Sequence, residues 1–337
     1  MTAPRGHHEP PPTLDSLTDL ATPWCVHVVS TLGVPEHLAA GPSRIDDLAA
    51  AVNVDAGALG RVLRHLVSCG VFEELEPGRF ALNDAARPLM DARPFLDLNG
   101  IGGRMAGAWS SLLAAVRTGA PAYHTVFGRP FWEDLEAHPE VAASFDALMG
   151  PAGHGAPDPE VIASQDWTSI RTVVDVGGGT GSLLAAILSV QRDVRGILVE
   201  RPGTVDRAAE TFRSAGVADR VTMSTQSFFD PLPAGADLYV LKNVLADWPD
   251  ADALALLTRV AEAARLSSRI VILGGITPDD SPSPELLMLV LVGGRSRTLS
   301  EFRALACEAG LEVTATRRQA SGRFVVECSR AAAGFTP

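Results

Sequence analysis

Residues 171–330 alternate short apolar runs with amphipathic segments of helical length, a pattern typical of strands that alternate with helices. The alternation predicts an α/β fold, in which a Rossmann-like, mainly parallel sheet carries helices on both faces. We expect the final two strands to form an antiparallel end of the sheet, and we place the strands at 172–176, 196–200, 221–225, 237–242, 269–274, 311–316 and 323–328. Ligands of such sheets bind beyond the carboxyl ends of the strands, so a site is expected there.

Residues 13–90 instead follow a helical period and predict a small, mainly helical domain. Helical signals across 14–38 are interrupted at Pro23 and Pro35, where we expect breaks because proline lacks a backbone N–H. The elements that follow are two short amphipathic helices at 45–52 and 56–68 and a hairpin formed by 71–75 and 79–82. Two helices followed by a hairpin are typical of a winged helix.

A winged helix can bind DNA or serve as a dimerisation module, and the charge of the chain decides between these two functions. The chain carries a formal net charge of −12, whereas a nucleic-acid partner needs a basic face. The helix that would read DNA carries only Arg61, Arg64 and His65 as basic residues. The sequence therefore favours a dimerisation module, with no nucleic-acid partner, over a ligand-responsive regulator.

The remaining segments predict connections and tails. Residues 1–12 are expected to be a disordered leader without the apolar core of a signal peptide, and residues 331–337 a tail. Residues 91–170 predict a helical connector, with helical segments at 96–109, 112–117 and 131–149. No apolar run is long enough to span a membrane, so we expect a cytoplasmic protein. The cysteines have no metal-ligand spacing, which predicts buried free thiols and no metal.

A glycine-rich turn follows the first strand of the α/β region. Asp175 lies on that strand, and Gly177, Gly179 and Gly181 follow it before an apolar helix. Glycine permits a positive φ and a close approach of a ligand to the backbone, and the N–H groups of the next helix point over the turn. Glu200 ends the second strand, where a carboxylate can accept hydrogen bonds from both ribose hydroxyls. The pattern predicts a nucleoside-type cofactor and leaves NAD and S-adenosylmethionine open.

Five ordered runs carry a family resemblance. Val173–Gly181 resembles the first motif of class I S-adenosylmethionine-dependent methyltransferases, and the later motifs are similar to 198–202, 227–233, 241–250 and 293–298. Together they resemble the small-molecule O-methyltransferases of plants and of actinobacterial antibiotic pathways. The N-terminal part, from 19–24 through 64–67, resembles the dimerisation domain of the bacterial members. The resemblance implies an S-adenosylmethionine-dependent methyltransferase of secondary metabolism, acting as a homodimer on a small aromatic substrate.

The resemblance also implies a set of cofactor contacts. The turn would hold the methionine portion, and Glu200 would bind the ribose. Arg201 would lie beside the adenine. The full set of implied contacts is Asp175, Gly177, Gly179, Gly181, Glu200, Arg201, Ser227, Phe228, Lys242 and Trp248. Residues implied to line the acceptor pocket, which the connector and the C-terminal region share, are Trp109, Met149, Met288 and Val292.

The catalytic positions of the family are vacant in this sequence. The plant-type base is a His that aligns with Ala246, and the two acids that orient it align with Gly274 and Ser296. The sequence therefore favours O-methylation by positioning alone, with a repurposed, non-methylating reaction (decarboxylation, hydroxylation, cyclisation or pericyclic chemistry) as the alternative. His154 is the candidate substitute base or substrate contact, whereas Asp247 usually has a structural role in family members. The acceptor, and whether oxygen, nitrogen or carbon receives the methyl group, stay open.

Overall fold

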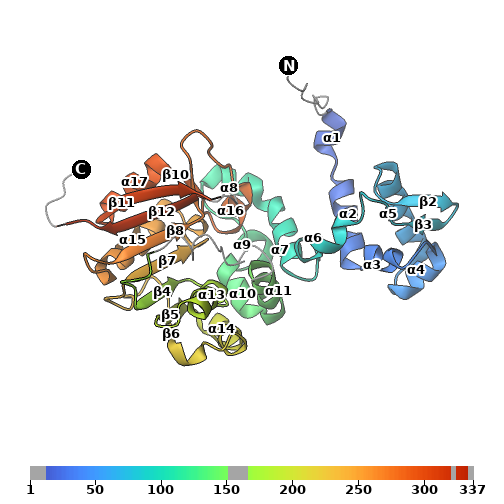
Figure 1. Cartoon of the computed structure of the whole chain (residues 1–337). Coiled ribbons are helices and arrows are strands. Elements are labelled where there is room, and N and C mark those ends of the chain that lie inside the picture. The colour runs from blue at the N-terminus through green and yellow to red at the C-terminus, as the bar shows by residue number, and fades with distance from the viewer. Residues whose placement is uncertain (1–12, 151–165, 320–323, 333–337) are drawn as a thin grey trace, which may run out of the picture. The chain divides into compact units, whose positions relative to one another are not determined.

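The computed structural model describes residues 13–150, 166–319 and 324–332, and it divides into two compact units at Arg104 and Met105. The expected leader at 1–12, most of the expected tail and His154 lie outside the described residues. The boundary lies beyond residue 90, where we expected the first domain to end, and the expected connector divides between the two units (Figure 1). No helix among the described residues is long and apolar enough to cross a membrane.

The N-terminal unit is a set of short helices with a three-stranded sheet of order β1-β3-β2. Its elements are α1 (Leu14–Thr18), α2 (Ala21–Thr31), α3 (Val34–Ala39), β1 (Ser43–Arg44), α4 (Ile45–Ala51), α5 (Ala56–Ser68), β2 (Glu73–Glu76), β3 (Arg79–Ala81) and α6 (Pro88–Leu96). Leu59, Leu63 and Leu66 on one face of α5 are buried in its core. The predicted pair of helices followed by a hairpin is therefore present in this unit.

The predicted helix breaks at the two prolines are wrong. Pro35 occupies the first turn of α3 and Pro23 the first turn of α2. N–H groups of the first turn have no partner within a helix, so proline costs nothing there. The breaks fall at 19–20 and 32–33 instead, where Gly33 adopts a positive φ of 70°.

Short helices connect the N-terminal unit to the large sheet. They are α7 (Ile101–Ala108), the 3₁₀ turn η1 (Trp109–Ser111), α8 (Leu112–Thr118), α9 (His124–Phe127), α10 (Phe131–Ala137) and α11 (Pro139–Met149). The helix predicted at 131–149 is thus two helices. His138 lies between them, just before Pro139, with φ −128° and ψ 82°, outside the helical region that a following proline disfavours.

The C-terminal unit contains a seven-stranded sheet of order β11-β12-β8-β7-β4-β5-β6. Its strands are β4 (Thr172–Val176), β5 (Arg195–Glu200), β6 (Val221–Thr225), β7 (Leu238–Lys242), β8 (Arg269–Leu273), β11 (Leu311–Arg318) and β12 (Phe324–Arg330). Strands β6, β5, β4, β7 and β8 are parallel, while β12 is antiparallel to both β8 and β11. The predicted α/β fold with an antiparallel end is confirmed.

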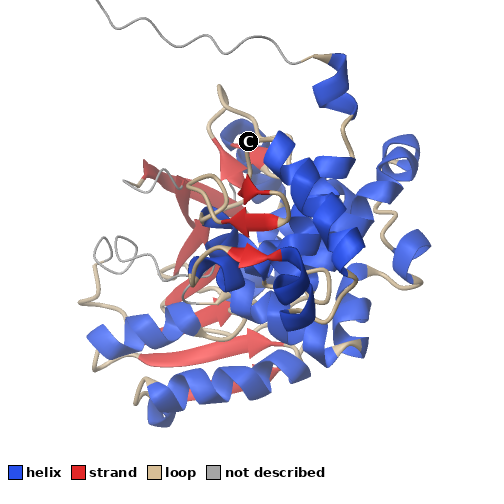
Figure 2. Ribbon diagram, turned by 90° about the vertical axis from the view of Figure 1, so that its right-hand side faces the viewer, coloured by secondary structure: helices blue, strands red, loops and turns tan. Residues whose placement is uncertain are grey.

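Helices pack on both faces of this sheet (Figure 2). Residues of α15 (Asp250–Ala263) and α17 (Leu299–Glu308) join one buried cluster, and residues of α13 (Ser182–Val190) and α14 (Pro202–Ser214) join the other. The smaller elements are η2 (Ala218–Arg220), η3 (Leu245–Asp247), β9 (Ile276–Thr277), α16 (Leu286–Leu291) and β10 (Arg297–Thr298). The strand order reverses beside β4, which places a crevice at the carboxyl ends of β4, β5 and β7.

The four cysteines are free, but the expectation that they are buried is correct for Cys328 alone. Cys25 and Cys307 are half-buried, and Cys69 is exposed.

Candidate functional site

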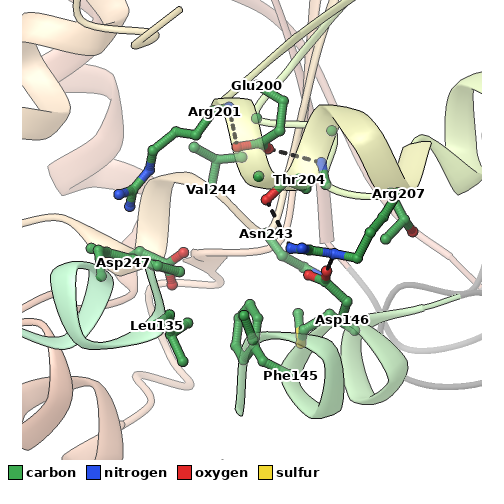
Figure 3. Close-up of a pocket in the computed structure, with 18 of the residues that line it drawn as sticks. Leu135, Phe145, Asp146, Glu200, Arg201, Thr204, Arg207, Asn243, Val244 and Asp247 are labelled. Atoms are coloured by element: carbon green, nitrogen blue, oxygen red, sulfur yellow. Dashed lines mark hydrogen bonds and ion pairs between the residues drawn. The ribbon is translucent and has the colours of Figure 1, made fainter. Parts of the chain in front are cut away.

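A pocket of about 550 Å³ opens at the carboxyl ends of β4, β5 and β7 (Figure 3). Its floor comes from the glycine turn and the residues after β5 and β7, and its other wall comes from α10 and α11. All of these residues belong to the C-terminal unit. The site is therefore complete within one unit of the fold.

The three glycines of the turn have different physical roles. All adopt positive φ angles: 66° at Gly177, 59° at Gly179 and 76° at Gly181. A Cβ at Gly181 would lie 2.3 Å from the ring of Phe212, so this glycine is required for the packing of α13, and it does not line the pocket. A Cβ at Gly179 would meet nothing within 4 Å, which leaves open space above the turn for a ligand.

Glu200 closes the turn from the end of β5. Its carboxylate accepts hydrogen bonds from the backbone N–H groups of Gly179 at 3.0 Å and Arg201 at 2.8 Å (Figure 3). The side chain is 9% exposed, and burial raises its pKa, while the two N–H groups act against the rise. Each oxygen keeps a lone pair for a further donor, so this carboxylate can receive the two hydroxyls of a ribose.

Asp175 supplies a second buried carboxyl at the end of β4. It is 1% exposed, and neither oxygen has a hydrogen-bond partner of good geometry among the described residues. Burial raises its pKa to about 7, an effect that the charge of Lys242 opposes and that of Glu200 increases. A buried carboxyl without partners is costly. A ligand that brings a cation or a hydrogen-bond donor would remove that cost.

The wall opposite the turn is aromatic. Trp132 on α10 and Trp248 after η3 stack with ring centroids 6.5 Å apart and an interplanar angle of 22°. Arg201 lies over the Trp132 ring at 5.4 Å from its centroid, and both indole N–H groups are buried without a partner in the described chain. Flat, apolar surfaces with unpaired donors suit a heteroaromatic base.

Two ion pairs join this wall to α14. Arg201 pairs with Glu136 of α10. Arg207 of α14 pairs with Asp146 of α11 (Figure 3). Burial raises the pKa of Asp146, and the Arg207 charge opposes that rise. Neither Trp132 nor these pairs were among the residues singled out in the sequence. The aromatic content of 121–132 was the available signal, whereas ion pairs between residues 61 or 65 apart leave no local pattern.

The structure places most of the expected cofactor contacts on the pocket wall. Those on it are Asp175, Gly177, Gly179, Glu200, Arg201, Phe228, Lys242 and Trp248. Ser227 is exposed beside the pocket, where its hydroxyl accepts the Phe229 N–H at 3.2 Å, and Gly181 lies beneath the turn.

Only one of the four residues expected to line the acceptor pocket lies on the wall of this pocket. Met149, at the end of α11, lines the pocket. Trp109 is 43% exposed and, like Met288 and Val292, is not part of this pocket wall.

The structure shows what surrounds Ala246, Gly274 and Ser296, the three positions at which the resemblance implies catalytic groups. A Cβ at Gly274 would lie 2.4 Å from Oδ1 of Asn243, so the Asn243 side chain occupies the space of an acid there. A Cβ at Gly275 would lie 2.9 Å from the Ala246 nitrogen. Ser296 donates its N–H to the carboxylate of Glu285 at 2.7 Å. An acid is therefore present beside position 296, supplied by a residue that the sequence did not point to.

The turn after β7 is held by a buried arginine. Arg297 is 1% exposed and donates to the carbonyl oxygens of Leu245 at 3.0 Å and Trp248 at 2.9 Å, and it also pairs with Asp250. These contacts fix Asp247, which lines the pocket on the side away from Arg207 (Figure 3).

Comparison with known proteins identifies the class to which this fold and site belong. Residues 14–92 match the O-methyltransferase dimerisation domain, and residues 109–312 match the O-methyltransferase domain. The chain belongs to this O-methyltransferase family, and it is an S-adenosylmethionine-dependent methyltransferase.

Two bacterial relatives are similar over most of their length. The chain is 40% identical to a 2,7-dihydroxy-5-methyl-1-naphthoate 7-O-methyltransferase of Streptomyces carzinostaticus, over 90% of this chain and 93% of the relative. It is also 40% identical to the aclacinomycin 10-hydroxylase RdmB of Streptomyces purpurascens, over 91% of this chain and 86% of that relative. The O-methyltransferase NcsB1 of neocarzinostatin biosynthesis, solved with S-adenosylmethionine and 2-hydroxy-5-methyl naphthoic acid, superposes with a TM-score of 0.88. That match has 38% identity and covers 95% of this chain and 99% of NcsB1.

The family match and the relative solved with S-adenosylmethionine settle the choice between NAD and S-adenosylmethionine for the latter, and the residues of the pocket fit this cofactor. The partly satisfied Glu200 suits the ribose hydroxyls, and Asp175, whose buried oxygens lack hydrogen bonds of good geometry, suits a cationic group. The aromatic wall of Trp132 and Trp248 suits the base.

Proposed function

We propose that the protein transfers the methyl group of S-adenosylmethionine to a hydroxyl of a small aromatic metabolite. The observation that carries the proposal is a single pocket in which the cradle of Glu200 and the glycine turn is continuous with Met149 and Asp247. Donor and acceptor can therefore lie within one pocket. The naphthoate methyltransferase and NcsB1, which was solved with a naphthoic acid, support an aromatic acceptor.

Positioning supplies most of the rate in this proposal. Holding donor and acceptor in line contributes about 7–11 kcal/mol, whereas general-base catalysis contributes about 10²–10⁴-fold, or roughly 3–5.5 kcal/mol. Ala246 leaves the His position vacant, and the described structure offers no space for an acid at Gly274 while Asn243 fills it. A site of this kind works by alignment and exclusion of water. Lys242 and Asp175 would fix the donor's charged groups, and the aromatic wall would hold its base.

The decisive test is transfer of labelled methyl. The protein is incubated with methyl-labelled S-adenosylmethionine and hydroxyaromatics, with 1,4-dihydroxy-2-naphthoic acid, the ligand of a structural relative, as the first acceptor. Label is expected in an ether product. A product that forms without label would contradict methyl transfer.

The second candidate is a non-methylating reaction on a cofactor-loaded site. It is favoured by one observation, that a relative with 40% identity over 91% of the chain is named a hydroxylase. The same incubation separates the two candidates, because hydroxylation leaves the label on the donor while the acceptor gains an oxygen.

The chain is further proposed to act as a homodimer through its N-terminal unit. The match to the dimerisation domain supports this, and so does the apolar surface of Leu14, Leu17 and Leu20, which are 74%, 68% and 75% exposed. Sedimentation should give twice the chain mass, and Leu17→Glu should shift it toward the monomer. A monomeric wild-type protein at micromolar concentration would contradict the dimer.

A further inference from the structure

The N-terminus of α16 presents a carboxylate at an unusual backbone position. Glu285 has φ 36° and ψ 49°, in the left-handed region that residues with a Cβ rarely adopt. Its carboxylate accepts two hydrogen bonds from Ser296, one from the backbone N–H at 2.7 Å and one from the hydroxyl. A strained backbone with two fixed hydrogen bonds holds this carboxylate in one place.

The segment that holds Glu285 is packed directly on the backbone of Asp247. A Cβ at Gly294 would lie 2.0 Å from the Ala246 oxygen and 2.4 Å from the Asp247 carbonyl carbon, so the two chains touch. Arg297 then ties the same two segments together through the carbonyls of Leu245 and Trp248. Glu285 and Asp247 are thus held relative to each other by backbone contacts rather than by long side chains.

The two carboxyls interact electrostatically. Burial raises the pKa of Asp247 to about 8, and the negative charge of Glu285 contributes to the rise. A negative charge close to a buried carboxyl favours the protonated form of that carboxyl. The other charged groups of the neighbouring segments have partners of their own, since Lys242 acts on Asp175 and Arg297 pairs with Asp250.

On the basis of the proposed methyl transfer, we propose that Asp247 accepts the proton of the acceptor hydroxyl, and that Glu285, fixed by Ser296, is the positioning residue that keeps Asp247 basic. Asp247 is on the pocket wall, one residue after the vacant position of Ala246. The pair replaces the missing His and its acid with two carboxyls from different segments. In this protein, Asp247 therefore has a chemical role in addition to a structural one.

The proton transfer balances. As the bond between the acceptor oxygen and the methyl carbon forms and the donor's sulfur–carbon bond breaks, the hydroxyl proton passes to an Asp247 oxygen. The sulfur leaves as a neutral thioether, and the proton is later lost to water. A base with a pKa near the working pH is the most effective for such a step. The acceptor that this arrangement suits is a hydroxyl that is still protonated when it binds.

The first test needs neither cofactor nor acceptor. The full-length chain is labelled with ¹³C at the aspartate carboxyls and titrated by NMR, with the Asp247 signal identified by its loss in Asp247→Asn. We expect it to titrate near pH 8, and to titrate at lower pH in Glu285→Gln and in Ser296→Ala. Asp280→Asn, which removes an exposed carboxyl before α16, is the control and should leave the signal unchanged. Titration near the ordinary value of about 4, or no response to Glu285→Gln, would overturn the proposal.

The second test uses the labelled methyl assay with 1,4-dihydroxy-2-naphthoic acid. The wild-type rate should rise with pH to a plateau above about pH 8, and the rise should move to lower pH in Glu285→Gln. Asp247→Asn should lower kcat about 10²-fold and abolish that rise, with little change in cofactor affinity. An unchanged profile in Asp247→Asn overturns the inference and leaves methyl transfer intact. Absence of label transfer from the wild type overturns methyl transfer itself, while the NMR titration still decides the carboxyl pair.

Discussion

Glu200 and Asp247 are two buried carboxyls on the wall of one pocket, and their surroundings are opposite. Glu200 receives two backbone N–H groups, so its negative charge is compensated before any ligand arrives. Burial raises the pKa of Asp247 to about 8, and the negative charge of Glu285 adds to the rise. A compensated carboxylate can accept hydrogen bonds without changing protonation, whereas an uncompensated one is ready to take a proton. The difference separates the binding end of the pocket from its proposed reacting end.

The largest effect on cofactor binding is expected when the negative charge of Glu200 is removed. Glu200→Gln should weaken the binding of S-adenosylhomocysteine about 10²-fold, because hydrogen bonds to a charged acceptor contribute about 1.5–3 kcal/mol each. Calorimetry measures the affinity. Glu210→Gln, an exposed glutamate on α14, serves as the control. Affinity within twofold of wild type would place the ribose elsewhere.

The aromatic wall should have the next largest effect at the binding end. Trp132→Ala is expected to weaken S-adenosylhomocysteine binding about tenfold, since an aromatic pair contributes about 0.5–1.5 kcal/mol beyond its buried area. Trp109→Ala is the matched control, because Trp109 is 43% exposed and off the pocket wall. Equal losses in both variants would mean that the pocket wall has been assigned incorrectly.

A smaller effect should appear in stability. The folded pKa of Asp247 is about 8, above the unfolded value of about 4, so between these pH values the folded state keeps a proton that the unfolded state has lost. As pH rises over that range, ionisation of Asp247 in the unfolded chain increasingly favours unfolding. The stability that the protonated Asp247 confers at low pH is therefore lost progressively up to about pH 8. Asp247→Asn should therefore raise Tm by about 2–4 °C at pH 8.5 and by less at pH 5. An equal change at both pH values would show a packing effect instead of a titration.

The smallest change is expected at Ala246, where the resemblance implies a base. Ala246→His restores the side chain but not its orienting acids, because Asn243 fills the space beside Gly274 and Ser296 is bound to Glu285. We expect kcat to change by less than about threefold, since an unoriented imidazole contributes little of the 10²–10⁴-fold available to a positioned base. A rise above about tenfold would show that the site is still built for histidine.

The binding end could be predicted from the sequence because its chemistry is contiguous. Asp175 and the glycines lie within seven residues, and Glu200 follows at the end of the next strand. Gly181 is an exception. Its spacing predicted a ligand contact, but in the structure its lack of a side chain leaves room for the Phe212 ring.

The reacting end could not be predicted in the same way. Glu285 lies in a proline-rich stretch without periodicity, and its meaning comes from Ser296, eleven residues away, and from Asp247 on another segment. The pair of Arg207 and Asp146 likewise exists only once α11 and α14 have come together. Both are products of tertiary packing, and a local pattern in the chain contains neither.

The position of β12 has a consequence for how the chain folds. This strand, at residues 324–330, lies between β11 and β8 and pairs with both. Strand β8 therefore has an unpaired edge throughout synthesis until residue 330 has been added, and that edge is a template for pairing with other chains. Pairing at such sequence separation is slow and exposes intermediates to aggregation. Chains that stop short of β12 should accumulate as aggregates even though every residue of the cofactor pocket has already been made.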